Sequence, residues 1–209
     1  RVTALKQSLA DSQARLHKYE WVETTIISLK GEEKARTQKR CYYGADGKVQ
    51  KIEIGEAPEA KAAPKGGRGG GRLKAKIVEN KKSEMHEYME RAAALIHQYV
   101  PPAPAQVQKV KDAGRLAITP LDQGRVGIAF TDYLQAGDRL TVVVNAAANN
   151  LGSLIVATYL DKPEDVVALD VGFATLEDGT SYTAQTTLDA KAKNIRVVIQ
   201  NSGHRPLTQ

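Results

Sequence analysis

A glycine- and cation-rich stretch, PKGGRGGGRLKAK at residues 64–76, is the first part of the chain whose residue types could bind a ligand. It holds five glycines and five cations. A nucleotide-binding phosphate loop needs a lysine and a hydroxyl residue after its last glycine, but Arg72 and Leu73 stand there. Single-stranded nucleic acid needs aromatic platforms for its bases, and residues 55–80 contain no aromatic side chain. The stretch therefore argues against a nucleotide site and against specific nucleic-acid binding.

Two interpretations of this stretch stay open. It is a flexible, solvated loop at residues 56–72, or it is a mobile basic segment that contacts an anionic membrane surface, where each cation contributes ~1 kcal/mol. The charge supports the second: residues 1–115 carry a net +9, residues 116–209 a net −3, and residues 61–82 hold eight cations and one acid. The cations predicted to touch such a surface are Lys65, Arg68, Arg72, Lys74 and Lys76.

The other reactive residue types form no catalytic or metal-binding pattern. His86 and Glu90 share a helix face and His97 lies further along it, but a metal site needs more ligands that converge. Cys41 alternates with polar residues beside two tyrosines, which favours a packed side chain over a nucleophile. Adjacent carboxylates all fall in predicted turns. We therefore predict no enzymatic activity, no metal and no cofactor.

Helical and strand periodicity alternate in the first half of the chain. Apolar residues at helical spacing predict a helix of about four turns from Val2 to Leu16. The β-branched segment 19–31 and the strand–turn–strand segment 34–54 predict a three-stranded antiparallel meander. After the glycine stretch, a stripe of Met and Tyr side chains predicts a second helix that ends at Pro101, and residues 104–114 predict a short third helix.

The second half of the chain predicts only strands. Seven apolar or alternating segments between residues 115 and 201 are separated by short turn sequences, and strands joined in this way pair antiparallel with their neighbours. About ten strands are too many for a flat sheet, which must curl to bury one face. We therefore predict one α+β domain at residues 1–209: a curved antiparallel half-barrel with the N-terminal helix and the inserted helical segment on its concave side.

The order of these elements resembles the bacterial lipoprotein-carrier (LolA-like) half-barrel superfamily, and uncharacterised exported bacterial proteins of that type most closely. The segments that carry the resemblance are RLHKYEWVETTIISLKGE, QKRCYYGADGK, EMHEYMERAAALIHQYVPP, FTDYL and ATYLDKPEDVVALDVGFATLEDGTSY. The resemblance implies a concave apolar surface that holds acyl chains, a periplasmic or secreted location, and a signal peptide that has been removed or precedes these residues.

The expected function follows from this fold. The leading hypothesis is a non-enzymatic exported monomer that binds a lipid or another apolar ligand in the concavity, in lipid or lipoprotein handling at the outer membrane and cell envelope. Its partners would be an acyl chain, a lipoprotein or an anionic membrane surface. The alternative is a protein-interaction module of the envelope whose core is filled by its own side chains.

The predicted cavity depends on poor filling of the curl. Aromatic residues make up only 5% of the chain, and Ala and Val side chains fill a wide space poorly. Alternation places Val126, Ile128 and Phe130 on one strand face, with the corresponding residues of the next two strands facing the same way. The residues predicted to line the apolar cavity are Trp21, Met85, Met89, Ala92, Ile96, Phe130, Val142 and Val156.

Overall fold

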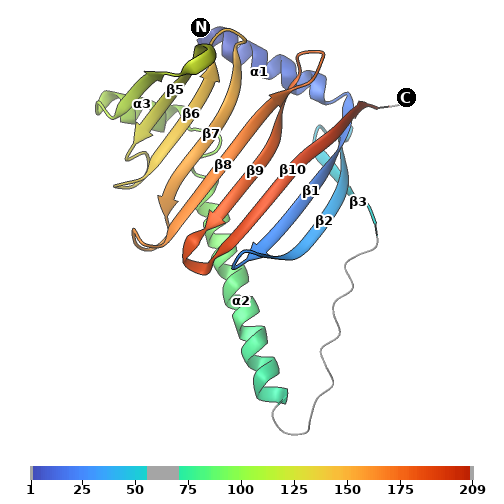
Figure 1. Cartoon of the computed structure of the whole chain (residues 1–209). Coiled ribbons are helices and arrows are strands. Elements are labelled where there is room, and N and C mark those ends of the chain that lie inside the picture. Colours follow the sequence, from blue (N-terminus) through green and yellow to red (C-terminus); the bar gives the residue numbers. More distant parts are fainter. Residues whose placement is uncertain (1, 56–70, 208–209) are drawn as a thin grey trace.

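The fold, seen in a computed structural model that describes residues 2–55 and 71–207, is built on a single ten-stranded antiparallel sheet (Figure 1). The sheet order is β3-β2-β1-β10-β9-β8-β7-β6-β5-β4, so every strand lies beside its sequence neighbours except that β3 and β4 stand at opposite edges, and β1 pairs with β10. The strands are β1 (Tyr19–Leu29), β2 (Glu32–Tyr43), β3 (Val49–Glu53), β4 (Leu116–Pro120), β5 (Arg125–Thr131), β6 (Arg139–Asn145), β7 (Asn150–Tyr159), β8 (Val166–Thr175), β9 (Ser181–Ala190) and β10 (Ile195–Pro206).

Three α-helices complete the fold: α1 (Val2–Leu16), α2 (Gly71–Ile96) and α3 (Pro104–Asp112). The α+β class and the N-terminal and inserted helices are confirmed, and β3 and β4 leave the sheet open at its two edges. Residues 56–70 of the predicted flexible loop lie outside the described part of the chain, whereas Gly71 and Arg72 belong to the first turn of α2.

The pairing of β1 with β10 joins the two ends of the chain. Ile26 pairs with Val198 and Leu29 with Ile195, and the ladder continues to Tyr19 opposite Pro206. Turn chemistry cannot specify this contact, because no turn connects the two strands. The pairing makes one continuous sheet from the N-terminal meander and the seven strands that follow the helices.

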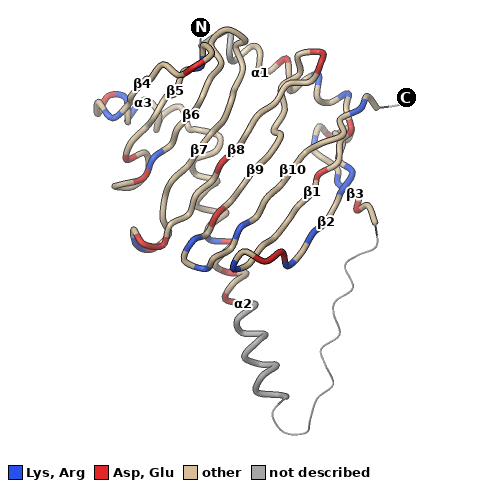
Figure 2. Tube along the Cα trace, in the orientation of Figure 1, with Lys and Arg blue, Asp and Glu red and all other residues tan. Residues whose placement is uncertain are grey.

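All three helices lie on the same face of the sheet, and no helix or strand of the described residues covers the opposite face (Figure 1). Lys, Arg, Asp and Glu gather mostly in the turns and at the strand ends, and strands β5, β6 and β7, toward the β4 edge of the sheet, are nearly free of charge (Figure 2). None of the helices, over the residues that the structure describes, combines the length and apolarity of a membrane span.

The main core lies between the helix-covered face and the last turns of α2. Strand register aligns Phe130, Leu140 and Val156 in one row across β5, β6 and β7, as the alternation predicts. Ala92 of α2 and Val110 of α3 have no exposed surface and belong to the same buried cluster as this row. Buried side chains from four strands and two helices thus form one cluster.

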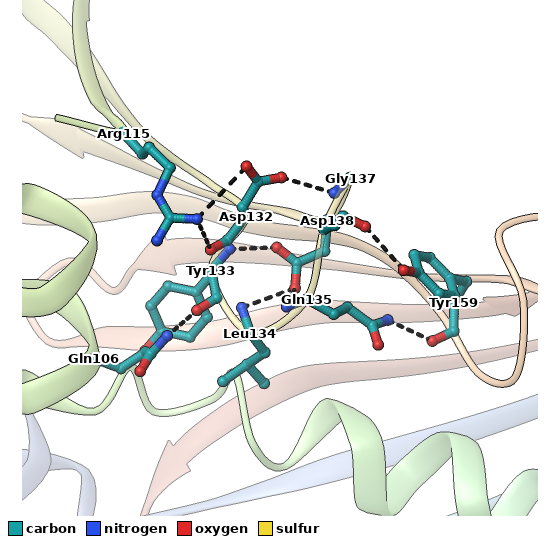
Figure 3. Close-up of polar contacts among 10 residues, drawn as sticks. Gln106, Arg115, Asp132, Tyr133, Leu134, Gln135, Gly137, Asp138 and Tyr159 are labelled. Carbon is teal, nitrogen blue, oxygen red and sulfur yellow. Dashed lines mark hydrogen bonds and ion pairs between the residues drawn. The ribbon is translucent and has the colours of Figure 1, made fainter. Parts of the chain in front are cut away.

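A buried carboxylate organises the loop between β5 and β6 (Figure 3). Asp138 has no exposed surface, and it accepts hydrogen bonds from the backbone N–H groups of Tyr133, Leu134 and Gln135, the last two at 2.9 and 2.8 Å. The side chain of Asp132 accepts another from the N–H of Gly137 at 2.7 Å. A buried charge is tolerated where several donors satisfy it, and here the donors come from the loop itself.

Tyr99, just beyond α2, connects this loop to the helical layer. Its hydroxyl donates to Asp138 and lies 2.8 Å from the hydroxyl oxygen of Thr158 on β7. Three turns earlier, Tyr88 donates to Asp165 in the turn after β7. The predicted stripe on this helix is therefore correct, and its two tyrosines hold α2 against two loops of the sheet through buried hydrogen bonds.

Replacing Ala92 by leucine should lower the free energy of unfolding by about 1–3 kcal/mol, because added methylenes in a close-packed core displace their neighbours. Urea denaturation measures this change. The matched control is Ala94→Leu, on the exposed side of the same helix, which should change stability by less than about 0.5 kcal/mol. Equal stability of the two variants would show that unfilled space remains beside Ala92.

Replacing Tyr99 by phenylalanine should cost about 1.5–3 kcal/mol, because it removes a donor from the buried carboxylate of Asp138 while keeping the ring. Tyr159→Phe is the matched control, since its hydroxyl donates to the carbonyl of Ala136 at an exposed position. Chemical denaturation of both variants compares the loss of unfolding free energy at the buried and at the exposed hydrogen bond. Losses of the same size would mean that the Tyr99–Asp138 bond is no stronger than an exposed one.

Tyr99 should also make stability depend on alkaline pH. Burial, and next the hydrogen bond to Asp138, raise the pKa of Tyr99 above its ordinary value. The unfolded chain, whose tyrosine ionises near pH 10, therefore loses this proton first as the pH rises. The contribution of Tyr99 to the free energy of unfolding is therefore complete below about pH 10 and decreases above it by ~1.4 kcal/mol per pH unit. The stability difference between parent and Tyr99→Phe, measured from pH 8 to 11, should narrow above pH 10; a constant difference would contradict this.

Candidate functional site

A pocket of about 310 Å³ lies between α1 and the helix-covered face of the sheet, at the end opposite the main core. We call it the aromatic pocket. α1 forms one wall, and five strands of the sheet form the other. Its lining residues are Leu9, Ser12, Gln13 and Leu16 of α1, Trp21 of β1, Tyr43 of β2, Phe173 of β8, Ser181, Tyr182 and Thr183 of β9, and Asn201 and His204 of β10.

Five rings follow one another across this pocket. His17 stacks on Tyr43 with ring centroids 4.1 Å apart, and Tyr43 lies 5.7 Å from Trp21. Trp21 stacks on His204 at 5.8 Å, and His204 lies 4.0 Å from Tyr182. Tyr43, Trp21, His204 and Tyr182 come from β2, β1, β10 and β9, which are neighbours in the sheet. The spacings of Trp21 to Tyr43 and to His204 are typical of favourable aromatic pairs, and the two pairs at the ends of the row are closer, so the pocket has a continuous aromatic wall.

The polar edge of Trp21 is satisfied within the protein. Its indole N–H donates to the side-chain oxygen of Asn201 at 3.0 Å, and the amide of Asn201 donates to the carbonyl of Thr183 at 2.9 Å. This chain of hydrogen bonds fixes the orientation of the ring. The indole is 8% exposed, and the part of the ring that lines the pocket presents apolar surface to a ligand.

Polar contacts hold the C-terminal end of α1 above the pocket. Arg15 donates to the hydroxyl of Thr180 at 3.0 Å and to the carbonyl of Gly179 at 3.3 Å, both in the turn before β9. Ser12, which is buried, accepts from Arg15 and from the backbone N–H of Ser181. Leu9 and Leu16 are only partly buried and face the pocket. α1 therefore covers the site without filling it.

His204 is the titratable group most affected by this environment. Burial lowers the pKa of His204 below its ordinary value, so its imidazole is neutral at pH 7. A neutral imidazole carries one N–H donor and one acceptor nitrogen. The pocket thus combines an apolar wall with one titratable polar ring.

The structure divides the residues that were predicted to line an apolar cavity. Trp21 lies in the aromatic pocket. The others lie in the main core or beside a smaller cluster formed by Tyr88, Ala190 and Ile195. Those in the main core are Ala92, Ile96, Phe130, Val142 and Val156, and those beside the smaller cluster are Met85 and Met89. Ala92 and Val156 have no exposed surface, so binding of a ligand by this set stays a prediction that requires the core to open.

The basic residues predicted to touch an anionic surface are not placed as a site. Lys65 and Arg68 lie outside the described residues, as do the side chains of Arg72, Lys74 and Lys76, whose backbone forms the first turns of α2. His86 makes an exposed contact with Glu90, with Nε2 3.3 Å from Oε1. Across residues 7–55 and 83–207, no group of three or more His, Cys, Asp or Glu side chains is arranged to hold a metal.

Sequence reasoning missed most of the aromatic pocket. Tyr43, Tyr182 and His204 carry no motif, and Tyr43 is separated from the other two by more than a hundred residues along the chain. The available signal for Tyr43 and Tyr182 was their position near strand ends in segments that were correctly predicted as strands, whereas His204 lies beyond the predicted last strand. The pairing of β1 with β2 brings Tyr43 to Trp21, and only the pairing of β1 with β10 brings His204 and Tyr182 to it.

A second cleft, of about 490 Å³, lies between α2 and the turns after β7 and β9. Its lining mixes acids and bases that pair with one another, as Arg91 does with Asp161. Its only aromatic lining residue, Tyr88, already donates its hydroxyl hydrogen to Asp165. The aromatic pocket is therefore the better candidate for an apolar ligand.

Comparison with known proteins gives one structural likeness. No protein-family model matches the chain, and no curated protein matches it. The crystal structure of a DUF1329 family protein from Desulfovibrio piger is similar at 12% sequence identity and a TM-score of 0.39, over 97% of this chain and 92% of that one. A likeness at this level carries no functional argument, and the candidate site rests on its geometry alone.

Proposed function

We propose that this protein binds a small apolar molecule, such as an acyl chain, in the aromatic pocket without catalysing a reaction on it. The observation that carries the proposal is unfilled space beside apolar rings in a protein whose main core is close packed. A volume of about 310 Å³ lies at the lower end of the range for ligand pockets, ~300–1,000 Å³. Each methylene buried there would contribute ~0.8 kcal/mol.

The proposal keeps the wider role implied by the resemblance to LolA-like carriers. In that role the protein is a periplasmic or secreted monomer that handles a lipid or the acyl chain of a lipoprotein at the cell envelope. The open sheet with helices on one face is compatible with it. We place the proposed ligand under α1 and not under α2, because Ala92 on α2 has no exposed surface.

One observation favours a second candidate function, a protein-interaction module of the envelope. The main core is filled by the protein's own side chains, and several of its members have no exposed surface. Ile118 on edge strand β4 is 63% exposed, which gives a partner an apolar contact. Binding of an apolar ligand in the aromatic pocket would favour the ligand-binding function over the interaction module.

The test uses Trp21, the only tryptophan of the chain, as a fluorescent probe in the pocket wall. Titration with decan-1-ol should change the emission and saturate, and native mass spectrometry should show one alcohol per chain. Leu9→Gln should raise the Kd about fivefold, which corresponds to ~1 kcal/mol, because it places an amide in the apolar wall.

Ala10→Gln is the matched control, since this residue is exposed on the same helix. It should bind decan-1-ol as the parent does. If the alcohol gives no saturable signal and no adduct, the pocket holds no apolar ligand and the interaction module becomes the better function.

A further inference from the structure

The hydrogen-bond donors of the aromatic pocket indicate what kind of head group its ligand carries. The hydroxyl of Tyr43 accepts a hydrogen bond from the amide of Gln13 at 2.9 Å. The hydroxyl of Ser12 accepts from Arg15 at 3.3 Å and from the N–H of Ser181 at 3.2 Å. Each hydroxyl has one hydrogen of its own. Among residues 7–55 and 83–207 no protein acceptor takes these two hydrogens, so both remain free to donate.

Tyr182 and His204 add two more free groups. Their rings lie 4.0 Å apart, and both line the pocket. Within the described part of the chain, neither the hydroxyl of Tyr182 nor a ring nitrogen of His204 makes a hydrogen bond to another residue. The two side chains thus bring one O–H and one N–H donor to the lining of the pocket, which Trp21 also lines.

The lining of the pocket contains no Asp or Glu. Its neutral acceptors include the side-chain oxygens of Gln13, Ser181 and Thr183, and the side-chain oxygen of Asn201 already accepts from Trp21. The groups that face His204 are Trp21 from β1 and Tyr182 from β9, with Tyr43 of β2 beyond Trp21. On α1, the cationic Arg15 donates a hydrogen bond to the lining residue Ser12. Donors and a neighbouring cation favour an anionic acceptor.

We propose that the aromatic pocket selects ligands with a carboxylate head group, which accepts hydrogen bonds from Tyr182 and His204 while the apolar tail lies against Trp21 and Phe173. This inference rests on the proposed function and adds the class of ligand to it. A medium-chain carboxylic acid fits the description. A neutral alcohol satisfies fewer donors, and an amine brings a cation to a site without acids.

The carboxylate should also couple binding to pH. A negative charge beside His204 favours the imidazolium form, which opposes the effect of burial on this group. Binding of the acid therefore takes up a proton, and by linkage the affinity rises as the pH falls. Binding of the neutral alcohol does not change the charge on His204, so its affinity should not follow pH.

The experiment compares decanoate, decan-1-ol and decylamine on the whole protein at pH 8, 7 and 6, by Trp21 fluorescence and calorimetry. Decanoate should bind at least threefold more tightly at pH 6 than at pH 8, and about tenfold more tightly than the alcohol at pH 6. Decylamine should bind most weakly. His204→Gln and Tyr182→Phe should each weaken the binding of decanoate more than the binding of decan-1-ol, so that most of the preference for decanoate is lost.

His97→Gln, at an exposed position of the linker after α2, is the control and should behave as the parent. Tyr182→Phe keeps the ring, so it tests the head group even if His204→Gln unfolds the chain. If decan-1-ol binds as tightly as decanoate at every pH, the head-group inference is wrong and the proposed function stands. If none of the three binds, both are wrong.

Discussion

The hydrogen bond between Tyr99 and Asp138 is the contact on which the arrangement of helices and sheet depends. A carboxylate without exposed surface must be fully satisfied by donors. Three backbone N–H groups of one loop supply most of them, and Tyr99 supplies the last. Because these donors come from a loop of the sheet and from the end of the α2 segment, the carboxylate can be satisfied only when the two are correctly docked.

This constraint sets the position of the packed half of the molecule. With Tyr99 fixed, the preceding turns of α2 place Ile96 and Ala92 on the sheet, where they enter the main core. Tyr88 makes a corresponding buried hydrogen bond to Asp165. Buried polar bonds are directional, unlike apolar contacts, so the two tyrosines specify which face of α2 meets the sheet and in what register, while the apolar stripe supplies most of the buried area.

The other half of the molecule is built differently. α1 is held by Arg15 and Ser12 through contacts with one turn and the start of β9, and its leucines leave a pocket instead of a core. Aromatic residues are scarce, with one Trp, eight Tyr and two Phe in the chain, yet four of these eleven line this pocket. Rings stiff enough to keep their shape without dense packing maintain an apolar surface that aliphatic side chains would fill.

The sequence by itself determined the local elements: the strands through their alternation and tight turns, the helices through their apolar stripes, and the large antiparallel sheet through the number of strands. It also indicated that Ala92, Ile96 and Phe130 face inward. Only the tertiary structure decided that β1 pairs with β10, and this pairing assembles Tyr43, Trp21, His204 and Tyr182 into one wall. The physical reason is that periodicity reports which face of an element is apolar, whereas pairing between strands distant in sequence depends on the closure of the whole fold. The same limit applies to the cavity predicted under α2: composition shows that the residues expected to line it are small, but only the structure shows that Ala92 and Val156 have no exposed surface.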